Sequence, residues 1–383
     1  MLPQNSFPHP AAEISMATAP TATHANVQCD VFVAFLDITL ERRVTVVCLL
    51  ASDTAATSRW QLVGARGFSE QTAASLSLSI ATHQGSSGGA THVGYADGGK
   101  FMRATVRMWD VASSSWLVLG RRGFSVGKVT SLSVATESGS LAAATGVLTP
   151  WVAYADKALQ NRVVIRKWNV ISSVWEDVGG VDVGTIGTAM SSGAARDINL
   201  LLLPPLHLDT TPDARLTPLV TYIVHTNAID SKAIARTFDG SKDTDTSGSD
   251  GASRAWPTVG SNGLLGFSIG RATGLVGAPA RLFTPDAQGE ERVQLLPEVL
   301  VAYQDASQGS KLMVENVRLL SSEGISSSSV CGGTPYPTPM KSTRAPTPRP
   351  TPQPSSMAPT PRAVTRGPTG RCIYLCFHFD SYY

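Results

Sequence analysis

The chain has 383 residues, of which 42% are hydrophobic and 16% charged, and its formal net charge is +2. Residues 324–383 hold six basic residues and one acid, so the preceding 323 residues carry a net charge of −3, which argues against nucleic-acid binding by this main part. Few long helix formers and much Gly, Ser, Thr, Ala and Val favour β-structure over a helical bundle. No apolar run approaches the roughly 20 residues of a membrane span, so we expect none.

The first 12 residues form an N-terminal segment that precedes the repeats of this chain. They lack both the basic start and the apolar core of a secretory signal. We therefore expect either a cytosolic protein or an incomplete chain start.

Two cysteines flank the first hairpin expected along the chain, at residues 31–47. Cys29 and Cys48 lie symmetrically about its centre, so they should face one another on adjacent strands. Either a disulfide or two buried thiols would fit this placement.

A five-residue pattern, W-x-x-[VL]-G, occurs four times, which is hard to attribute to chance. It begins at the following residues: Trp60, Trp116, Trp175 and Trp256. A second pattern, an apolar strand that ends in Asp, accompanies it as VAFLD, VGYAD, VAYAD and VAYQD. One unit departs from this pattern and reads VTYIV around Tyr222, without the acid.

Each unit divides into four short strands, as in SLSLSIAT, THVGYA, ATVRMWDV and SWLVLG of the second unit. Leu76, Leu78 and Ile80 alternate with serines, as expected for a strand with one buried face. A unit of this size cannot cover its own apolar faces, so neighbouring units must stack. The pattern therefore predicts a β-propeller, in which twisted sheets pack face to face around an axis.

The fold predicted is an all-β, five-bladed propeller of four-stranded blades over residues 13–323. The innermost strands are expected near residues 13–18, 75–82, 131–136, 196–203 and 275–283. The fifth blade has no Trp-containing outer strand after KLMVENVRLL, so the last blade or the closure of the ring is expected to be incomplete. An incomplete chain start, an open ring or a replacement strand from residues 1–8 would each account for this.

The combination of W-x-x-[VL]-G-x-x-GFS with SLSLAT-like and VAYAD-like strands resembles tandem propeller repeats of secreted bacterial and algal proteins of unassigned function. The resemblance covers roughly residues 13–320. More distantly, the repeats are similar to those of propeller lectins and five-bladed glycoside hydrolases, although no motif of either family can be transferred to particular residues. The resemblance implies the fold and leaves the ligand open.

The composition changes after the repeats. Residues 324–371 form a basic Pro/Thr/Ser-rich linker, expected to be disordered or extended, and residues 372–383 form a short apolar end. The linker resembles the Thr/Pro stalks of secreted and cell-wall proteins. A ligand for a proline-reading module is the alternative.

Candidate ligand-binding residues come from turns that a propeller places on one rim. They are Tyr95, Asp97, Arg121, Arg122, Tyr154, Asp156, Tyr303 and Asp305. Carboxylates, guanidinium groups and aromatic rings together could bind sugar hydroxyls. The alternative is that each Asp caps a turn, because a requirement of folding also produces equivalent residues in equivalent blades.

No catalytic constellation is expected, since the repeated acids are interchangeable by position and the seven His are scattered. Residues 243–254 begin like a calcium loop but have Arg254 where a bidentate Glu is needed, so neither metal nor cofactor is predicted. We expect a monomeric, non-catalytic binding or adhesion module, extracellular or at the cell surface, that presents a propeller rim to a glycan or protein. The alternatives are a glycoside hydrolase-like propeller enzyme and a structural cell-wall protein.

Overall fold

The computed structural model describes the repeats and parts of their connections. The described residues are 10–24, 27–50, 60–82, 89–137, 148–178, 190–191, 193–203, 217–225, 231–237, 258–259, 271–285, 291–308, 311–318 and 326–329. The first nine residues, the predicted linker after residue 329 and the apolar end at 372–383 therefore lie outside them.

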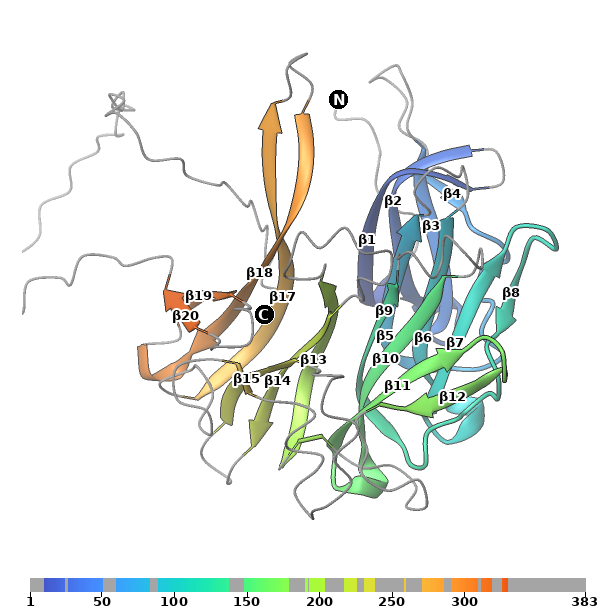
Figure 1. Ribbon diagram of the computed structural model, residues 1–383. Coiled ribbons are helices and arrows are strands. Elements are labelled where there is room, and N and C mark those ends of the chain that lie inside the picture. Colours follow the sequence, from blue (N-terminus) through green and yellow to red (C-terminus); the bar gives the residue numbers. More distant parts are fainter. Residues whose placement is uncertain are drawn as a thin grey trace, which may run out of the picture. The chain divides into compact units, whose positions relative to one another are not determined.

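The described strands form five antiparallel four-stranded sheets, and within each sheet the strands follow sequence order (Figure 1). Blade 1 consists of β1 (Ala11–His24), β2 (Val27–Asp37), β3 (Arg43–Leu50) and β4 (Trp60–Leu62). Blade 2 consists of β5 (Ala73–Thr82), β6 (Gly89–Asp97), β7 (Arg103–Asp110) and β8 (Ser115–Val118). Blade 3 consists of β9 (Val129–Glu137), β10 (Thr149–Asp156), β11 (Arg162–Asn169) and β12 (Val174–Asp177).

The last two blades follow the same plan. Blade 4 consists of β13 (Ala194–Leu203), β14 (Thr217–His225), β15 (Ser231–Thr237) and β16 (Thr258–Val259). Blade 5 consists of β17 (Ala272–Pro285), β18 (Glu291–Asp305), β19 (Lys311–Arg318) and β20 (Ser326–Ser329). The first strands of successive blades, β1, β5, β9, β13 and β17, contact one another in that order. The chain is thus a five-bladed β-propeller, and the five predicted innermost strands are confirmed.

One detail of the predicted fifth blade is wrong. The repeat pattern predicts no Trp-containing outer strand after KLMVENVRLL, and hence an incomplete last blade or ring closure, but β20 pairs with β19 and completes this sheet. The segment Ser326–Ser329 has no Trp and no apolar alternation, because an outermost strand needs only backbone pairing on one edge. A search for the W-x-x-[VL]-G pattern therefore misses it.

The repeated Trp joins neighbouring blades. Trp116 Nε1 donates a hydrogen bond to the Val63 carbonyl of the preceding blade at 2.8 Å, and Trp175 repeats the bond with Leu119 at 3.0 Å. The Trp116 ring also stacks on Phe68, with centroids 4.6 Å apart. These two Trp residues therefore pack between blades, while Trp256 lies outside the described residues.

Glycine is required at the end of the W-x-x-[VL]-G pattern for two reasons, its backbone conformation and the space available for a side chain. Gly64 has φ +79°, a region that L-residues rarely adopt, and a Cβ placed there would lie 2.3 Å from the Trp109 ring. Gly120 has φ +68° and would meet Trp168 in the same way. Trp, Gly and the next blade's Trp thus form one packing unit, which explains why the phrase recurs as a whole.

Serine hydroxyls connect the innermost strands of successive blades. Ser15 Oγ accepts the Leu78 N–H at 2.9 Å, and Ser77 Oγ accepts the Val134 N–H at the same distance. Ser133 repeats the bond with the Leu200 N–H at 3.0 Å. These inner-strand serine bonds link backbones that belong to different sheets, so they satisfy donors that no sheet partner reaches.

Cys29 and Cys48 form a disulfide between β2 and β3, with Cα atoms 5.8 Å apart, so the first of the two predicted alternatives is confirmed. Both cysteines are buried in the core of blade 1. The helices of the described segments are three-residue 3₁₀ turns, and none is long and apolar enough to cross a membrane.

Candidate functional site

The repeated Asp residues cap short turns. Asp37, Asp97 and Asp156 are the N-caps of the 3₁₀ turns η1 (Ile38–Leu40), η2 (Gly98–Lys100) and η3 (Lys157–Leu159). Each carboxylate accepts the N–H two residues ahead at 2.9–3.0 Å, and all three side chains are buried. The turn-capping hypothesis is therefore confirmed, and it accounts for the repetition of these acids without a ligand.

The last blade has the same arrangement. Asp305 is buried and accepts the Ser307 N–H at 2.8 Å, at the start of η5 (Ala306–Gln308). Blade 4, which has Val224 in place of this acid, has no such turn among its described residues.

The repeated Tyr residues lie inside the blades. Tyr95, Tyr154 and Tyr303 are at most 1% exposed, so their rings pack within the protein and offer no face to a ligand at the rim. Burial raises the pKa of Tyr95 to about 12, so its hydroxyl stays protonated at neutral pH. The structure thus places six of the eight predicted ligand-binding side chains in the interior, as support for the rim.

The two arginines lie closer to solvent. Arg121 is exposed, whereas the Arg122 guanidinium lies against η2. It binds both oxygens of Asp97, at 2.5 Å through Nε and 2.9 Å through Nη2. Arg66, at the equivalent position of blade 1, binds Asp37 at 2.6 Å. Burial raises the pKa of Asp37, but hydrogen bonds from Thr39 and Arg66 outweigh this effect and hold that pKa below its ordinary value.

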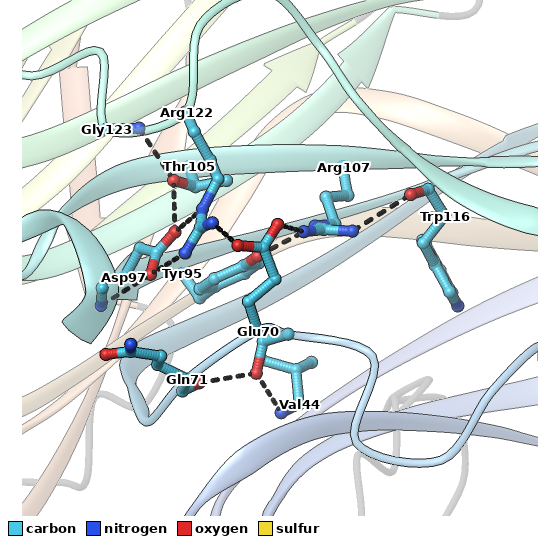
Figure 2. Close-up of polar contacts among 12 residues, drawn as sticks. Val44, Glu70, Gln71, Tyr95, Asp97, Thr105, Arg107, Trp116, Arg122 and Gly123 are labelled. Atoms are coloured by element: carbon cyan, nitrogen blue, oxygen red, sulfur yellow. Dashed lines mark hydrogen bonds and ion pairs between the residues drawn. The ribbon is translucent and has the colours of Figure 1, made fainter.

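The structure joins Asp97, Arg122 and Tyr95 to two further residues that the sequence analysis did not single out. We call the five residues Glu70, Tyr95, Asp97, Arg107 and Arg122 the Glu70 cluster (Figure 2). The Glu70 carboxylate pairs with Arg122 through one oxygen and with Arg107, 3.5 Å away, through the other. Glu70 comes from the connection between blades 1 and 2, while the other four residues belong to blade 2 or the turn that follows it. The cluster therefore marks the junction of these two blades.

A large aromatic side chain is exposed on the turn that Asp97 caps. Phe101 follows η2 directly, has φ +57°, and is 84% exposed. The Arg122 guanidinium lies against the same turn, since a Cβ placed on Gly99 would be 2.7 Å from its Nη2. The equivalent residues of blades 1 and 3, Glu41 and Gln160, have the same backbone conformation and are polar.

Sequence reasoning missed Glu70, Arg107 and Phe101 because it searched for residues that the blades share. The structure shows that the shared Asp, Tyr, Trp and Gly residues are used by the fold itself. The informative signal would have been a position at which equivalent blades carry different residues, such as Phe101 where blades 1 and 3 have polar residues. The fold does not require one particular residue at such a position.

The chemistry available at the Glu70 cluster is recognition by charge and hydrogen bonding. Asp97 is buried, and its oxygens accept bonds from Gly99, Thr105 and Arg122. Within the described part of the chain, no group of three or more His, Cys, Asp or Glu side chains could hold a metal ion. The calcium-like loop at residues 243–254 lies outside that part.

Comparisons with known proteins give no information on the site. No protein-family model matches the sequence, and no curated protein matches it. Among solved structures, a variant of levansucrase from B. megaterium is similar at 10% identity and a TM-score of 0.39, over 84% of this chain and 85% of that one. An α-L-arabinofuranosidase from Clostridium thermocellum is similar at 10% identity and a TM-score of 0.33, over 82% of this chain and 91% of that one. A likeness at these TM-scores carries no argument about this chain.

Proposed function

We propose that this chain is a non-catalytic, extracellular binding module that holds a glycan at the rim of blade 2. The observation that supports this best is Phe101, a residue that is 84% exposed on a turn fixed at both ends. Its turn is anchored by the Asp97 cap on one side and by the bond from the Met102 N–H to the Asp97 carbonyl, 2.8 Å, on the other. A rigid, exposed aromatic face beside charged hydrogen-bonding groups is what sugar rings require for stacking and orientation.

The predicted rim residues take different parts in this proposal. Phe101 and Arg121 would contact the sugar, since both are exposed, and Arg122 would donate from the edge of the Glu70 cluster. Tyr95 and Asp97 would hold Arg107 and Arg122 in place from below. In blades 3 and 5, Tyr154, Asp156, Tyr303 and Asp305 would support the fold only.

The extracellular location rests on two features. Cys29 and Cys48 form a disulfide, and disulfides persist in oxidising compartments but are rare in reducing ones. The Pro/Thr-rich linker at residues 324–371 has the composition of a stalk that would hold the propeller away from a surface.

A glycan array with the full chain tests the proposal, followed by calorimetric titration of the best ligand. Phe101→Ala should weaken binding by about tenfold or more, because burying a Phe ring contributes roughly 1.5–3 kcal/mol. Gln160→Ala is the matched control, since this residue has φ +59° on the equivalent turn of blade 3, and it should leave the affinity unchanged. Equal affinities for the Phe101→Ala variant and the unchanged protein, or no glycan bound at all, would refute the proposal.

The glycan identified on the array also distinguishes a binding module from a hydrolase. The bound glycan is incubated with the protein and the release of reducing ends is followed over time. Release of reducing ends would favour an enzyme, and release retained in an Asp97→Asn, Asp156→Asn double variant would show that these two acids are not catalytic. Retention on cell walls that depends on the linker, without any soluble ligand, would favour a structural wall protein.

A further inference from the structure

We infer that Arg107 and Arg122 form a cradle for a ligand carboxylate, that Glu70 fills this cradle in the structure, and that the ligand is a glycan containing uronic acid. This inference rests on the proposed function and deepens it, because it names the class of sugar that the rim of blade 2 would select.

Each guanidinium is held by two of its nitrogens and leaves the third toward Glu70. Arg122 binds Asp97 through Nε and Nη2, and its Nη1 meets one Glu70 oxygen. Arg107 binds the Tyr95 hydroxyl through Nε at 2.9 Å and the Trp116 carbonyl through Nη1 at 3.1 Å, and its Nη2 meets the other Glu70 oxygen. Two donors from two fixed arginines therefore converge on the two oxygens of one carboxylate (Figure 2).

The cradle needs an anion. Its arginine side chains are only 17% and 9% exposed, for Arg122 and Arg107, and Asp97 neutralises just one of them. Without Glu70, a partly buried guanidinium would keep an unpaired charge, which is unfavourable in a poorly solvated place. A second carboxylate that arrives from solvent would restore the balance.

Glu70 is placed to leave the cradle. Its side chain is 61% exposed, in contrast to the arginines that it binds. The backbone beside it is fixed, because Ser69 Oγ accepts the Val44 N–H and donates to the Gln71 carbonyl, both at 2.9 Å. Rotation of the Glu70 side chain alone would therefore open the cradle without moving the blades.

The corresponding arginine of blade 3 is used differently. Arg166 occupies the position of Arg107, but its carboxylate partner is Asp177 on the next strand of the same sheet, 2.7 Å away. The residue that follows the equivalent of Ser69 is Val126, whose N–H binds Asp156 at 3.2 Å. The convergence of two guanidinium groups on one exposed carboxylate is thus a feature of the junction between blades 1 and 2 among the described residues.

A uronic acid could bind both the arginine cradle and Phe101. Its carboxylate would take the place of the Glu70 carboxylate, and its pyranose ring would reach toward Phe101, which ends the turn against which the Arg122 guanidinium lies. A neutral sugar could contact Phe101 but would place no carboxylate in the cradle.

The test compares trigalacturonate with its fully methyl-esterified form, which has the same sugar rings without charge, by calorimetric titration of the full chain. Glu70→Ala removes the internal competitor and should raise the affinity for the acid by about tenfold, the value of one charge-assisted hydrogen bond, without a gain for the ester. Glu70→Gln should lie between this variant and the unchanged protein. Asp177→Ala is the matched control in blade 3 and should gain nothing.

A second readout keeps the test valid if either Glu70 variant is less stable. Trigalacturonate should raise the Tm of Glu70→Ala by more than it raises the Tm of the unchanged protein. An equal gain for acid and ester, or no gain for the acid, overturns the cradle. If the ester still binds through Phe101 in that case, the proposed glycan binding stands, whereas binding of neither oligomer in any variant overturns both.

Discussion

Replacing Ser77 by Ala tests the inner-strand serine bonds directly. The Ser77 hydroxyl accepts the Val134 N–H across the junction of blades 2 and 3 at 2.9 Å, and both residues are buried. β9 pairs with β10 on one side only, so the Val134 N–H has no sheet partner in blade 2 to replace the lost hydroxyl. A buried donor without a partner costs about 1–3 kcal/mol, and this is the expected fall in the free energy of unfolding.

Urea unfolding followed by tryptophan fluorescence measures this change. The midpoint should fall while the slope of free energy against urea stays constant, because the surface exposed on unfolding is unaltered. Thr130→Ala is the control, since this residue is exposed on the same strand β9 and should cost less than about 0.5 kcal/mol.

A loss below about 0.5 kcal/mol for Ser77→Ala, with an unchanged slope, would refute the reasoning. It would mean that water or a shift of the strand satisfies the Val134 N–H. The repetition of Ser in the inner strands would then need another explanation.

Three further outcomes are expected. Trp116→Phe should lower the free energy of unfolding by about 1–3 kcal/mol in the same urea assay, since it leaves the buried Val63 carbonyl without its donor; a neutral effect would contradict the role of this bond. Burial lowers the pKa of His92 to about 3 from 6.5, so the unfolded chain takes up the proton first and stability should fall as the pH drops below 6.5, by at most about 1.4 kcal/mol per pH unit. His92→Gln should show a shallower slope between pH 6.5 and 5, and identical slopes would exclude this histidine as the cause. Replacing Cys29 and Cys48 together by Ala should cost about 3 kcal/mol, measured by urea unfolding under oxidising conditions, and dithiothreitol should then destabilise only the unchanged protein.

The architecture was predictable because each blade of a repeat protein has similar structural requirements, so the same sequence pattern recurs along the chain. Strand alternation in SLSLSIAT, the W-x-x-[VL]-G pattern and the symmetric cysteines each reflect a local requirement, and the structure confirms the blades and the disulfide. The outer strand Ser326–Ser329 was missed because backbone pairing at a sheet edge leaves no side-chain pattern.

The candidate site was predictable only in part. Asp97 and Arg122 were found, but as members of a ring of equivalent residues, whereas the structure separates the buried caps from the exposed edge. Glu70 and Arg107 are 37 residues apart in the chain, and no spacing rule connects them.

The amino-acid sequence by itself determined the number of blades, the innermost strand of each and the residues that most blades reuse, since periodic burial and tight turns are local demands on the chain. Only the tertiary structure decided which side chains remain available for recognition. Exposure and ion pairing across a blade junction depend on how neighbouring sheets pack, and that packing buries Tyr95 and Asp97 while it leaves Phe101 and Glu70 at the surface.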